Sequence, residues 1–408
     1  MFKRALTIAT LVGWFGSSSA SAQTTTCGNT KLSCLLPTAF HSNPPTFNFF
    51  NEAFGTQIGQ LPLATPASGF IYTFNGSVYT DTQESFGPLL AQRLETIGRH
   101  KLYLAFTYQR FGFSEIDGND LSNIPILLNF PAEPPNAQVV TATENRVDAT
   151  VDQFAAFATF GLTDRIDVSV AVPFERISMG VTSTGTEYCS TCTAKASFNQ
   201  SLAGSADGIG DLVVSTKSTL LKHKSTLLFR HKEEFGLALG AELRFPTGDA
   251  RNFLGSGALG VKPYFVVARQ GVVAPHLNVG YQWNSDSVLA ADKNGKRQPL
   301  PGFFSYALGA DIGLKKRLTV VADWVGQLFF NAPQVSTPRS LLVTVNNQPA
   351  PLPSVVLFNG SYKVNNLGVG VKANPVRHLL VTANVTIKLD NGGLRAKVVP
   401  LGGISYSF

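Results

Sequence analysis

Charged side chains are scarce in this sequence: Asp, Glu, Lys and Arg together make up 14% of its 408 residues. Ordinary soluble proteins carry roughly 25%. The formal net charge is +7, but the basic residues are scattered singly along the chain. Nucleic-acid binding needs such charges to be clustered, so this distribution excludes it. Glycine (37 residues) and phenylalanine (30 residues) are abundant instead.

Long apolar runs are also missing after residue 22, where no stretch approaches the 18 or so residues of a membrane-spanning helix. A membrane protein with this sequence must then be a barrel, because only helices and closed barrels satisfy every backbone hydrogen bond in hydrocarbon. The sequence contains no GxSxG, HExxH or other metal-ligand spacing, and its histidines are isolated. We therefore expect no enzyme, no metal and no cofactor.

The N-terminus has the order of residues that signal peptidase recognises. Lys3 and Arg4 are followed by an apolar run, Ala5–Phe15, and by the small residues Ala20-Ser21-Ala22. We expect cleavage after Ala22 and export by the Sec route. An uncleaved anchor is the alternative, but the apolar run is shorter than the roughly 20 residues that span a bilayer.

Only four cysteines are present, in two local pairs, Cys27 with Cys34 and Cys189 with Cys192. In an exported chain we expect each pair to form a short disulfide. The second pair also has the CxxC spacing of a redox or zinc motif. No second CxxC, nearby histidine or βαβ pattern accompanies it, which favours a disulfide that closes a loop.

Apolar residues alternate with polar or small ones through most of the chain after Lys101. In Glu234–Phe245 and in Arg377–Leu389, every second residue is apolar or alanine. Soluble strands are usually about 5 or 6 residues long. These blocks approach the roughly 9 to 11 residues that a tilted strand needs to cross a bilayer. The sequence therefore predicts an all-β protein, a transmembrane antiparallel up-and-down β-barrel with a mostly irregular N-terminal segment.

The blocks give about 12 strands, with roughly 14 as the alternative because weak strands are the hardest to recognise. An even number puts both ends of the barrel on the periplasmic side. The expected strands are Leu102–Gly112, Arg146–Phe160, Arg165–Ser178, Ile209–Leu220, Glu234–Phe245, Ala258–Ala268, His276–Asn284, Phe303–Leu314, Arg317–Phe330, Ser361–Lys372, Arg377–Leu389 and Ala396–Phe408.

The connections between the blocks are alternately short and long, which is typical of outer-membrane barrels with tight periplasmic turns and longer outer loops. The expected short turns are Thr163–Arg165, Gln270–Ala274, Lys315–Lys316 and Asn374–Val376. The expected long loops are Glu115–Thr143, Thr182–Asp207, Ser285–Gly302 and Asn331–Gly360. The connection at Leu221–Lys232 is longer than a periplasmic turn should be.

Residues 23–100 precede the barrel and differ from it in composition. Asn75-Gly76 lies between two short β-prone stretches and predicts a hairpin. The apolar face of Phe86–Ile97 predicts a short helix. The segment is either a lumenal plug or gate, or a tail packed under the barrel, and the sequence leaves both open. We thus expect a signal peptide over 1–22, a periplasmic or plug segment over 23–100 and the barrel over 101–408.

If the apolar faces contact lipid, the opposite faces line the lumen and carry charges of both signs. Mixed signs favour ion pairs that fill a narrow barrel, whereas a few of these residues near a constriction would select the solute. Both roles stay open. The charged residues expected to line the lumen are Asp211, Lys217, Glu242, Arg244, Lys262, Asp311, Asp323 and Lys388, together with Asp167, Glu175 and Lys372.

The C-terminus has apolar residues at alternate positions, Ile404, Tyr406 and the final Phe408. This ending resembles the signal by which the barrel-assembly machinery recognises its clients. The resemblance implies that this machinery is a partner and that the protein resides in the outer membrane of a Gram-negative bacterium.

Two further motifs, Gly208–Leu212 and Leu243–Asp249 with Leu254–Gly257 after it, have sufficient structural explanations as a flexible strand entry and a turn at the outer rim. They also resemble the recurrent motifs of an outer-membrane transporter family named for the meta-cleavage pathway of phenol degradation. That family is loosely similar to fatty-acid and aromatic-hydrocarbon channels.

The resemblance implies a channel for passive uptake of small, hydrophobic or aromatic solutes, with outer-membrane lipid and a small apolar solute as partners. A structural or adhesive barrel and a barrel-borne hydrolase are the alternatives. The hydrolase would need Ser, His and an acid brought together on one face of the barrel.

Overall fold

The computed structural model describes residues 31–35, 45–63, 72–74, 79–81, 91–132, 137–191, 195–225, 233–291, 296–315, 317–376 and 378–408. The expected signal peptide, Cys27 and Cys192 lie outside these residues. Cys34 and Cys189 are both disulfide-bonded.

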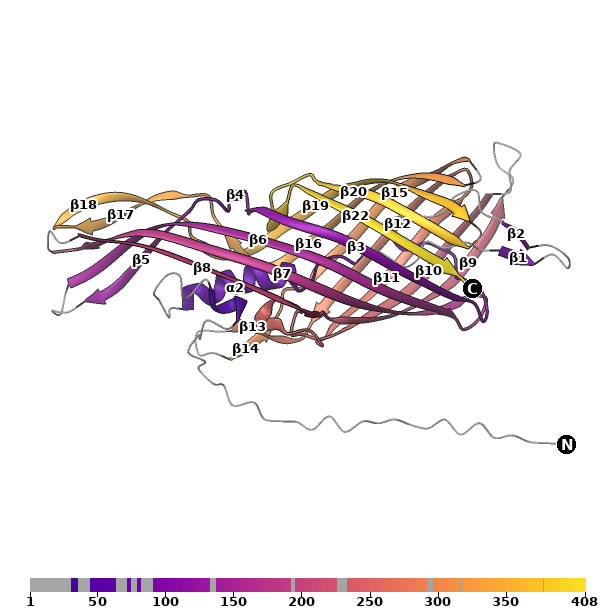
Figure 1. The fold of residues 1–408 in the computed structure, drawn as a ribbon, viewed down its shortest axis with the longest axis horizontal. Coiled ribbons are helices and arrows are strands. Elements are labelled where there is room, and N and C mark those ends of the chain that lie inside the picture. Colours follow the sequence, from indigo (N-terminus) through magenta and orange to yellow (C-terminus); the bar gives the residue numbers. More distant parts are fainter. Residues whose placement is uncertain are drawn as a thin grey trace, which may run out of the picture.

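Twelve antiparallel strands form a closed barrel (Figure 1). The last strand, β22, pairs with β20 on one side and with the first barrel strand, β3, on the other, and β3 also pairs with β6. The predicted barrel and strand number are therefore confirmed. The barrel strands are β3 Leu102–Ile116, β6 Ala137–Gly161, β7 Ile166–Cys189, β9 Leu212–Ser225, β10 Glu233–Phe245, β11 Gly260–Gln270, β12 Val273–Asn284, β15 Phe303–Lys315, β16 Leu318–Val335, β19 Leu357–Val376, β20 Leu379–Lys388 and β22 Val398–Ser407.

The alternation in sequence becomes an apolar outer surface. On β10, Leu239 and Leu243 are each 38% exposed, whereas Ala238, on the opposite face, is fully buried. The same belt of exposed apolar residues surrounds the barrel and ends at Ile404 and Tyr406 on β22 and at Phe408, which follows that strand. A closed barrel with such a belt is the architecture of an outer-membrane protein. Within the described residues, no helix has the length and hydrophobicity to span a membrane.

The outer connections contain strands rather than irregular loops, which corrects the prediction of four long loops. Strands β6 and β7 have 25 and 24 residues, far more than a bilayer crossing needs. Together with β5, β8, β17 and β18 they project well beyond one end of the barrel (Figure 1). The non-barrel strands after residue 101 are β4 Asn119–Asp120, β5 Ile124–Ala132, β8 Lys195–Ile209, β13 Asp286–Ala291, β14 Arg297–Pro299, β17 Arg339–Val345, β18 Gln348–Ser354 and β21 Leu394–Ala396.

Strand β7 shows why the part of the sheet beyond the barrel can be exposed to water. Up to Phe174, which is 44% exposed, its outward side chains are apolar. Beyond that point Arg176 and Ser178 face outward, and Ile177 and Met179 are buried inside. The apolar face therefore switches from the outside to the inside of the sheet, which marks the outer edge of the membrane belt.

At the opposite end the strands are joined by short turns, as predicted. The turns after β6, β11, β15 and β19 occupy the few residues between Gly161 and Ile166, Gln270 and Val273, Lys315 and Leu318, and Val376 and Leu379. Strand β9 extends to Ser225, which pairs with Glu233 of β10. The first part of the Leu221–Lys232 connection is therefore paired strand rather than loop. We take this end as periplasmic because short turns lie there in outer-membrane barrels.

The N-terminal region differs from its prediction in one element. A short hairpin is present, with strands β1 Tyr72–Phe74 and β2 Tyr79–Asp81. The helix predicted over Phe86–Ile97 is wrong for Ala91–Ile97, which is not helical. Among the described residues of this region, the helix is instead α2, Pro45–Ile58, and a 3₁₀ turn, η1, Leu32–Cys34, precedes it. A second 3₁₀ turn, η2, Ala250–Asn252, follows β10.

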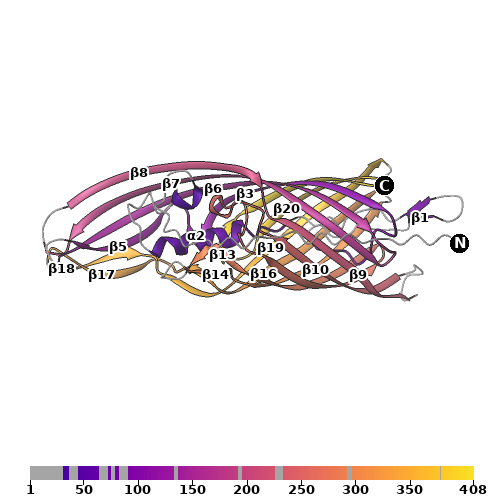
Figure 2. The ribbon, with the colours of Figure 1, turned by 90° about the horizontal axis from the view of Figure 1, so that it is seen from below.

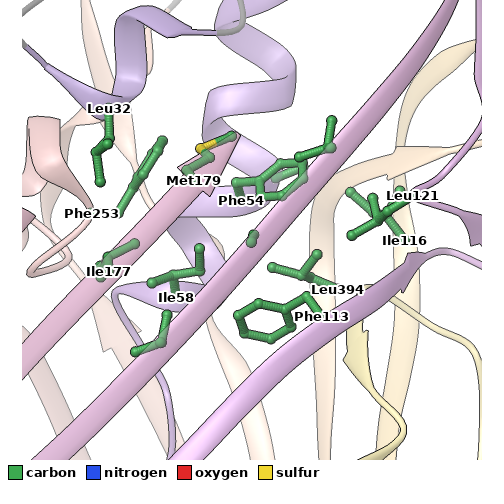
Figure 3. Packing of buried hydrophobic residues seen from close by; sticks show 14 of the residues in the cluster. Leu32, Phe54, Ile58, Phe113, Ile116, Leu121, Ile177, Met179, Phe253 and Leu394 are labelled. Atoms are coloured by element: carbon green, nitrogen blue, oxygen red, sulfur yellow. The ribbon is translucent and has the colours of Figure 1, made fainter. Parts of the chain in front are cut away.

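Helix α2 lies in the concave side of the barrel and extension (Figure 2). Its Phe54 and Ile58 are buried in the main apolar cluster, beside Ile116 of β3 and Leu394 of β21 (Figure 3). Full burial of one such side chain stabilises by about 1.5–3 kcal/mol. The helix is thus held where the barrel meets the extension.

Candidate functional site

The lumen contains two stretches of the N-terminal region. The first, which we call the outer segment, is Glu52–Leu63 and comprises the end of α2 and the residues after it. The second, the inner segment, is Ala91–Ile97 and lies closer to the periplasmic turns. Both contact side chains that point inward from the barrel strands.

The outer segment is bonded to the wall by a few polar groups in addition to its apolar packing. Arg244 Nη1 of β10 donates to the Gly59 carbonyl at 2.9 Å. Gln109 Nε2 of β3 donates to the Pro62 carbonyl at 2.6 Å, and the Leu394 amide donates to Gln57 Oε1 at 2.7 Å. These bonds attach the segment to three different parts of the barrel.

The inner segment is held by hydrogen bonds to its backbone and by packing of Leu94 against Ala238, Tyr264 and Val266. Lys217 Nζ of β9 donates to the carbonyls of Arg93 (2.9 Å) and Glu95 (2.7 Å). Thr219 Oγ1 donates to the Leu94 carbonyl at 3.1 Å. In a helix over Phe86–Ile97 the Arg93 carbonyl would accept from the Ile97 amide. Here that carbonyl accepts from Lys217 and that amide donates to Asp167, which favours a non-helical backbone.

Two more wall residues bind the ends of the inner segment. Asn278 Nδ2 donates to the Gln92 carbonyl at 3.1 Å, and the Ile97 amide donates to the Asp167 carboxylate at 3.0 Å. Within the segment, Arg93 Nε and Glu95 Oε2 form a buried ion pair at 3.1 Å.

A buried charged cluster lies in the wall on strands β12, β15, β16 and β19. His276 Nε2 contacts Asp323 Oδ1 at 2.8 Å, and His276 Nδ1 contacts Asp311 Oδ1 at 3.2 Å. Lys372 is fully buried and interacts electrostatically with both aspartates and with Arg93. The cluster thus links the wall to the inner segment.

A cavity of about 180 Å³ lies between the two segments and the wall. Polar side chains on one part of its lining include Glu242, Lys262, Arg244 and Gln282. Glu242 and Lys262 are register partners on β10 and β11 and form an ion pair. The apolar part is formed by Phe157, Ala171, Val213, Phe303, Val325 and Val364.

The sequence matches the family model described as "Putative MetA-pathway of phenol degradation" over residues 131–335, which is half of the chain. The chain belongs to this family. Its sequence matches no curated protein.

Solved structures similar to this family member include other outer-membrane barrels. An outer membrane channel from Pseudomonas putida F1 is 13% identical, with a TM-score of 0.44, over 78% of this chain and 99% of that one. The Pseudomonas putida toluene transporter TodX is 7% identical, with a TM-score of 0.30, over 84% and 96%. The translocator domain of the autotransporter NalP from Neisseria meningitidis is 10% identical, with a TM-score of 0.32, over 76% and 89%.

The two motifs that resembled the phenol-degradation family are bonded to each other. Asp211 accepts hydrogen bonds from the amides of Gly248 (3.2 Å) and Ser256 (2.8 Å). Thr247 Oγ1 donates to the Gly210 carbonyl at 2.7 Å. The motifs therefore join two neighbouring strands at the outer rim, and every contact of Asp211 named here is structural.

The charged residues predicted to line the lumen fall into three groups. Glu242, Arg244 and Lys262 line the cavity. Lys217, Asp311 and Asp323 are buried in the contacts around the inner segment. Asp211 and Lys388 lie toward the outer rim, where Lys388 forms an ion pair with Glu115. Of the additional three, Asp167 binds Ile97, Glu175 accepts from Gln153, and Lys372 joins the His276 cluster.

Sequence reasoning missed the neutral and histidine side chains of the lumen. His276, Asn278 and Gln282 were in a recognised alternating block, on the face opposite to Leu277 and Val279. That pattern already placed them inside, so the signal was available. The carbonyls of Gly59 and Arg93 gave no signal, because a backbone group is the same at every position.

Proposed function

We propose that the protein is an outer-membrane channel for passive uptake of small hydrophobic or aromatic solutes. The observation that carries the proposal is the cavity of about 180 Å³, which is bounded by four aromatic and several aliphatic residues, among polar ones, inside a membrane-spanning barrel. An apolar cavity of roughly 150 Å³ is enough to hold benzene. Membership of a family described by phenol degradation supports an aromatic solute.

We also propose that residues 23–100 act as a plug. Both described lumenal segments are bonded to the wall and border the cavity, so they occupy part of the lumen. Conduction then requires at least one segment to move. A barrel of about 12 strands lies between side-chain-filled barrels of about 8 strands and open porins of about 16, so a small segment suffices to close it.

Planar-bilayer recordings and liposome uptake of aromatic and aliphatic solutes test both proposals. The mature protein should take up apolar solutes, and deletion of residues 23–100 should raise its ion conductance. Folding of the deletion variant is checked by its heat-dependent mobility shift on electrophoresis. Absence of uptake and of conductance in both folded proteins would refute the channel.

The hydrolase alternative has less support. Both ring nitrogens of His276 contact aspartates, so this histidine is not poised to activate a serine. An adhesive role is favoured by one observation, the sheet extension beyond the barrel, where Leu342 at the β17–β18 hairpin is 77% exposed. Removal of the hairpin should abolish cell or surface attachment if adhesion is the function, and should leave uptake unchanged if it is not.

We also propose how the chain is processed, cross-linked and assembled. Residues 1–22 are removed on export, which intact-mass analysis would test. The disulfides are Cys27–Cys34 and Cys189–Cys192, which peptide mapping of the oxidised protein would test. Ile404 and Tyr406, which face outward on β22, and the exposed Phe408 after it form the signal for the barrel-assembly machinery. Substitution of Phe408 should reduce assembly of the barrel in cells.

A further inference from the structure

We infer that the outward face of strands β3, β6, β7 and β8, where the barrel meets its extension, binds a phosphorylated glycolipid of the outer leaflet, and that Arg110 and Arg176 bind its phosphate groups. The inference concerns the outer surface and does not rest on the proposed channel function. It is carried by the order of the outward side chains along these strands. That order is apolar, charged and then hydroxylated, which matches the acyl chains, phosphates and sugars of such a lipid.

An aromatic row lies at the edge of the membrane belt. The four strands are neighbours in one sheet (Figure 2), and the outward register partners at this level are Tyr108, Phe154, Phe174 and Ile209. The last three are 49%, 44% and 56% exposed, and the rings of Tyr108 and Phe154 lie 4.8 Å apart. Aromatic residues mark the membrane–water interface in outer-membrane barrels, so acyl chains end at this level.

The next outward row has a charge on every strand. Its register partners across the sheet are Arg110, Asp152, Arg176 and Asp207. Asp152 lies 3.4 Å from Arg110 and accepts a hydrogen bond from the Tyr108 hydroxyl at 2.6 Å. Arg110 still has 55% of its side chain exposed. Arg176 is exposed and forms no ion pair within the described part of the chain. Both guanidinium groups can therefore bind an anion directly above the aromatic row.

Beyond the charged row the outward side chains are small, and most have a hydroxyl group. The next register partners are Gly112, Thr150, Ser178 and Ser205. Farther out, the hydroxyls of Thr182 on β7 and Ser201 on β8 are bonded to each other at 3.0 Å. Small side chains leave the sheet surface flat, and hydroxyls both donate and accept. Sugar rings can lie on such a surface and exchange hydrogen bonds with it.

The alternating signs of the charged row suit a headgroup that has both phosphates and hydroxyls. A guanidinium binds phosphate through two parallel hydrogen bonds, whereas a carboxylate accepts from a sugar hydroxyl. A phosphate lipid without sugars would leave Asp207 without a donor, and an uncharged glycolipid would leave Arg110 and Arg176 without an anion. The complementary partner is therefore a lipid that carries phosphates on sugars.

The charged row is confined to one side of the barrel. At the same end of β10, β11, β12 and β15, the last outward residues are apolar and exposed, namely Phe245, Val261, Trp283 and Phe304. Charges that only mark the membrane boundary would surround the barrel. Their restriction to adjacent strands is the distribution expected of a binding surface.

Binding of diphosphoryl lipid A to the full mature protein in detergent, measured by native mass spectrometry, tests the inference. Monophosphoryl lipid A and phosphatidylglycerol are the comparison probes, since the first lacks one phosphate and the second has no sugar. Diphosphoryl lipid A should bind at least about 10-fold more tightly than either, because hydrogen bonds to charged groups are the strong ones. Excess inorganic phosphate should not displace it, since phosphate has no acyl chains to pack on the aromatic row.

The double variant Arg110→Gln, Arg176→Gln should bind diphosphoryl lipid A at least about 10-fold more weakly and should no longer distinguish it from the monophosphoryl form. Arg146→Gln is the matched control. Arg146 is exposed on β6, six residues beyond the charged row, and pairs with Asp148 at 2.9 Å. It should leave every affinity unchanged. All three arginines are exposed, and folding of each variant is checked by its heat-dependent mobility shift on electrophoresis.

Unchanged binding of diphosphoryl lipid A to the folded double variant would overturn the inference. Equal binding of phosphatidylglycerol, or displacement by inorganic phosphate, would overturn it too, because the surface would then bind any anionic lipid or any phosphate. An equal loss of affinity in Arg146→Gln would show that position in the charged row does not matter. None of these outcomes bears on solute uptake, which depends on the lumen.

Discussion

The two lumenal segments lie in one barrel but differ in how their backbone groups are bonded. The outer segment ends a helix whose backbone bonds to itself, and Phe54 and Ile58 anchor it by apolar packing. The inner segment has no secondary structure, so the barrel wall must satisfy its backbone, and Lys217 and Thr219 do so.

This difference indicates which segment moves. Apolar packing is non-directional, so a helix can shift and still find partners. Hydrogen bonds from a buried lysine to specific carbonyls have no such alternative, because displacement leaves buried polar groups unpaired. We therefore expect the inner segment to anchor the N-terminal region and the outer segment to open first.

Among the substitutions considered, loss of Lys217 should change the exposure of a lumenal segment the most. Lys217→Met removes two hydrogen bonds from a charged donor and leaves the carbonyls of Arg93 and Glu95 unpaired, which costs roughly 4 kcal/mol at about 1.5–3 kcal/mol per bond. The inner segment should open, and ion conductance should rise. Maleimide labelling of an introduced Ala91→Cys, which is buried in the parent, should accelerate by more than about 100-fold.

Lys363→Met is its control, because Lys363 is exposed on the outer face of β19. It should not change the labelling rate. An equal rate in Lys217→Met and the parent would show that the inner segment is not held by these bonds.

Truncation of Phe54, which packs the outer segment into the apolar cluster, should have the second-largest effect. Phe54 is fully buried, and Phe→Ala in a packed core costs about 3 kcal/mol or more. Phe54→Ala should accelerate labelling of Ala53→Cys by roughly 100-fold and leave Ala91→Cys protected. The control is Phe358→Ala, at a residue that is 45% exposed. Simultaneous exposure of both cysteines would mean that the two segments move as one unit.

The outer segment should also respond to pH through Glu52 of α2. Burial raises the pKa of this carboxyl from 4.5 to about 7. Because the raised pKa favours the protonated form in the packed state, packing is strongest below pH 4.5, weakens as pH rises to about 7, and is then constant. Because the thiolate is the reacting species, the labelling rate of Ala53→Cys is divided by that of a free thiol at the same pH. This ratio should increase several-fold across that window. In Glu52→Gln this increase should be absent, and its persistence would assign the pH dependence to another group.

The sequence specified the barrel well because its information is local. Alternation along a strand reports two environments, lipid and lumen, so Leu239 and Leu243 were placed outside without knowledge of any neighbour. The same rule failed beyond the membrane. At Glu175 and Arg176 the apolar face of β7 changes sides, and a strand of bilayer length was expected to end near Ser178.

The lumenal segments could not be predicted in this way, because their conformations depend on distant residues. The apolar residues of Phe86–Ile97 suit a helix. Lys217 of β9 and Asp167 of β7, both distant in sequence, instead bind the Arg93 carbonyl and the Ile97 amide, which would pair with each other in that helix. Helix α2 is the opposite case, because distant contacts create a helix that its own residues do not favour. Its Asn, Thr, Phe and Gly residues are weak helix formers, and contacts with β13 and β16 stabilise it.

The smallest change in labelling rate is expected for loss of a neutral hydrogen bond to the inner segment, in contrast to the charged bonds of Lys217. Thr219→Val keeps the shape and β-branching of the side chain but removes the hydroxyl that donates to the Leu94 carbonyl. One neutral hydrogen bond contributes about 1 kcal/mol, so labelling of Ala91→Cys should accelerate roughly 5-fold. Thr184→Val, on the exposed face of β7, should leave the rate unchanged. If Thr219→Val instead matched Lys217→Met, the segment would be held by all its bonds acting as one cooperative unit, and the lysine would have no special part in anchoring it.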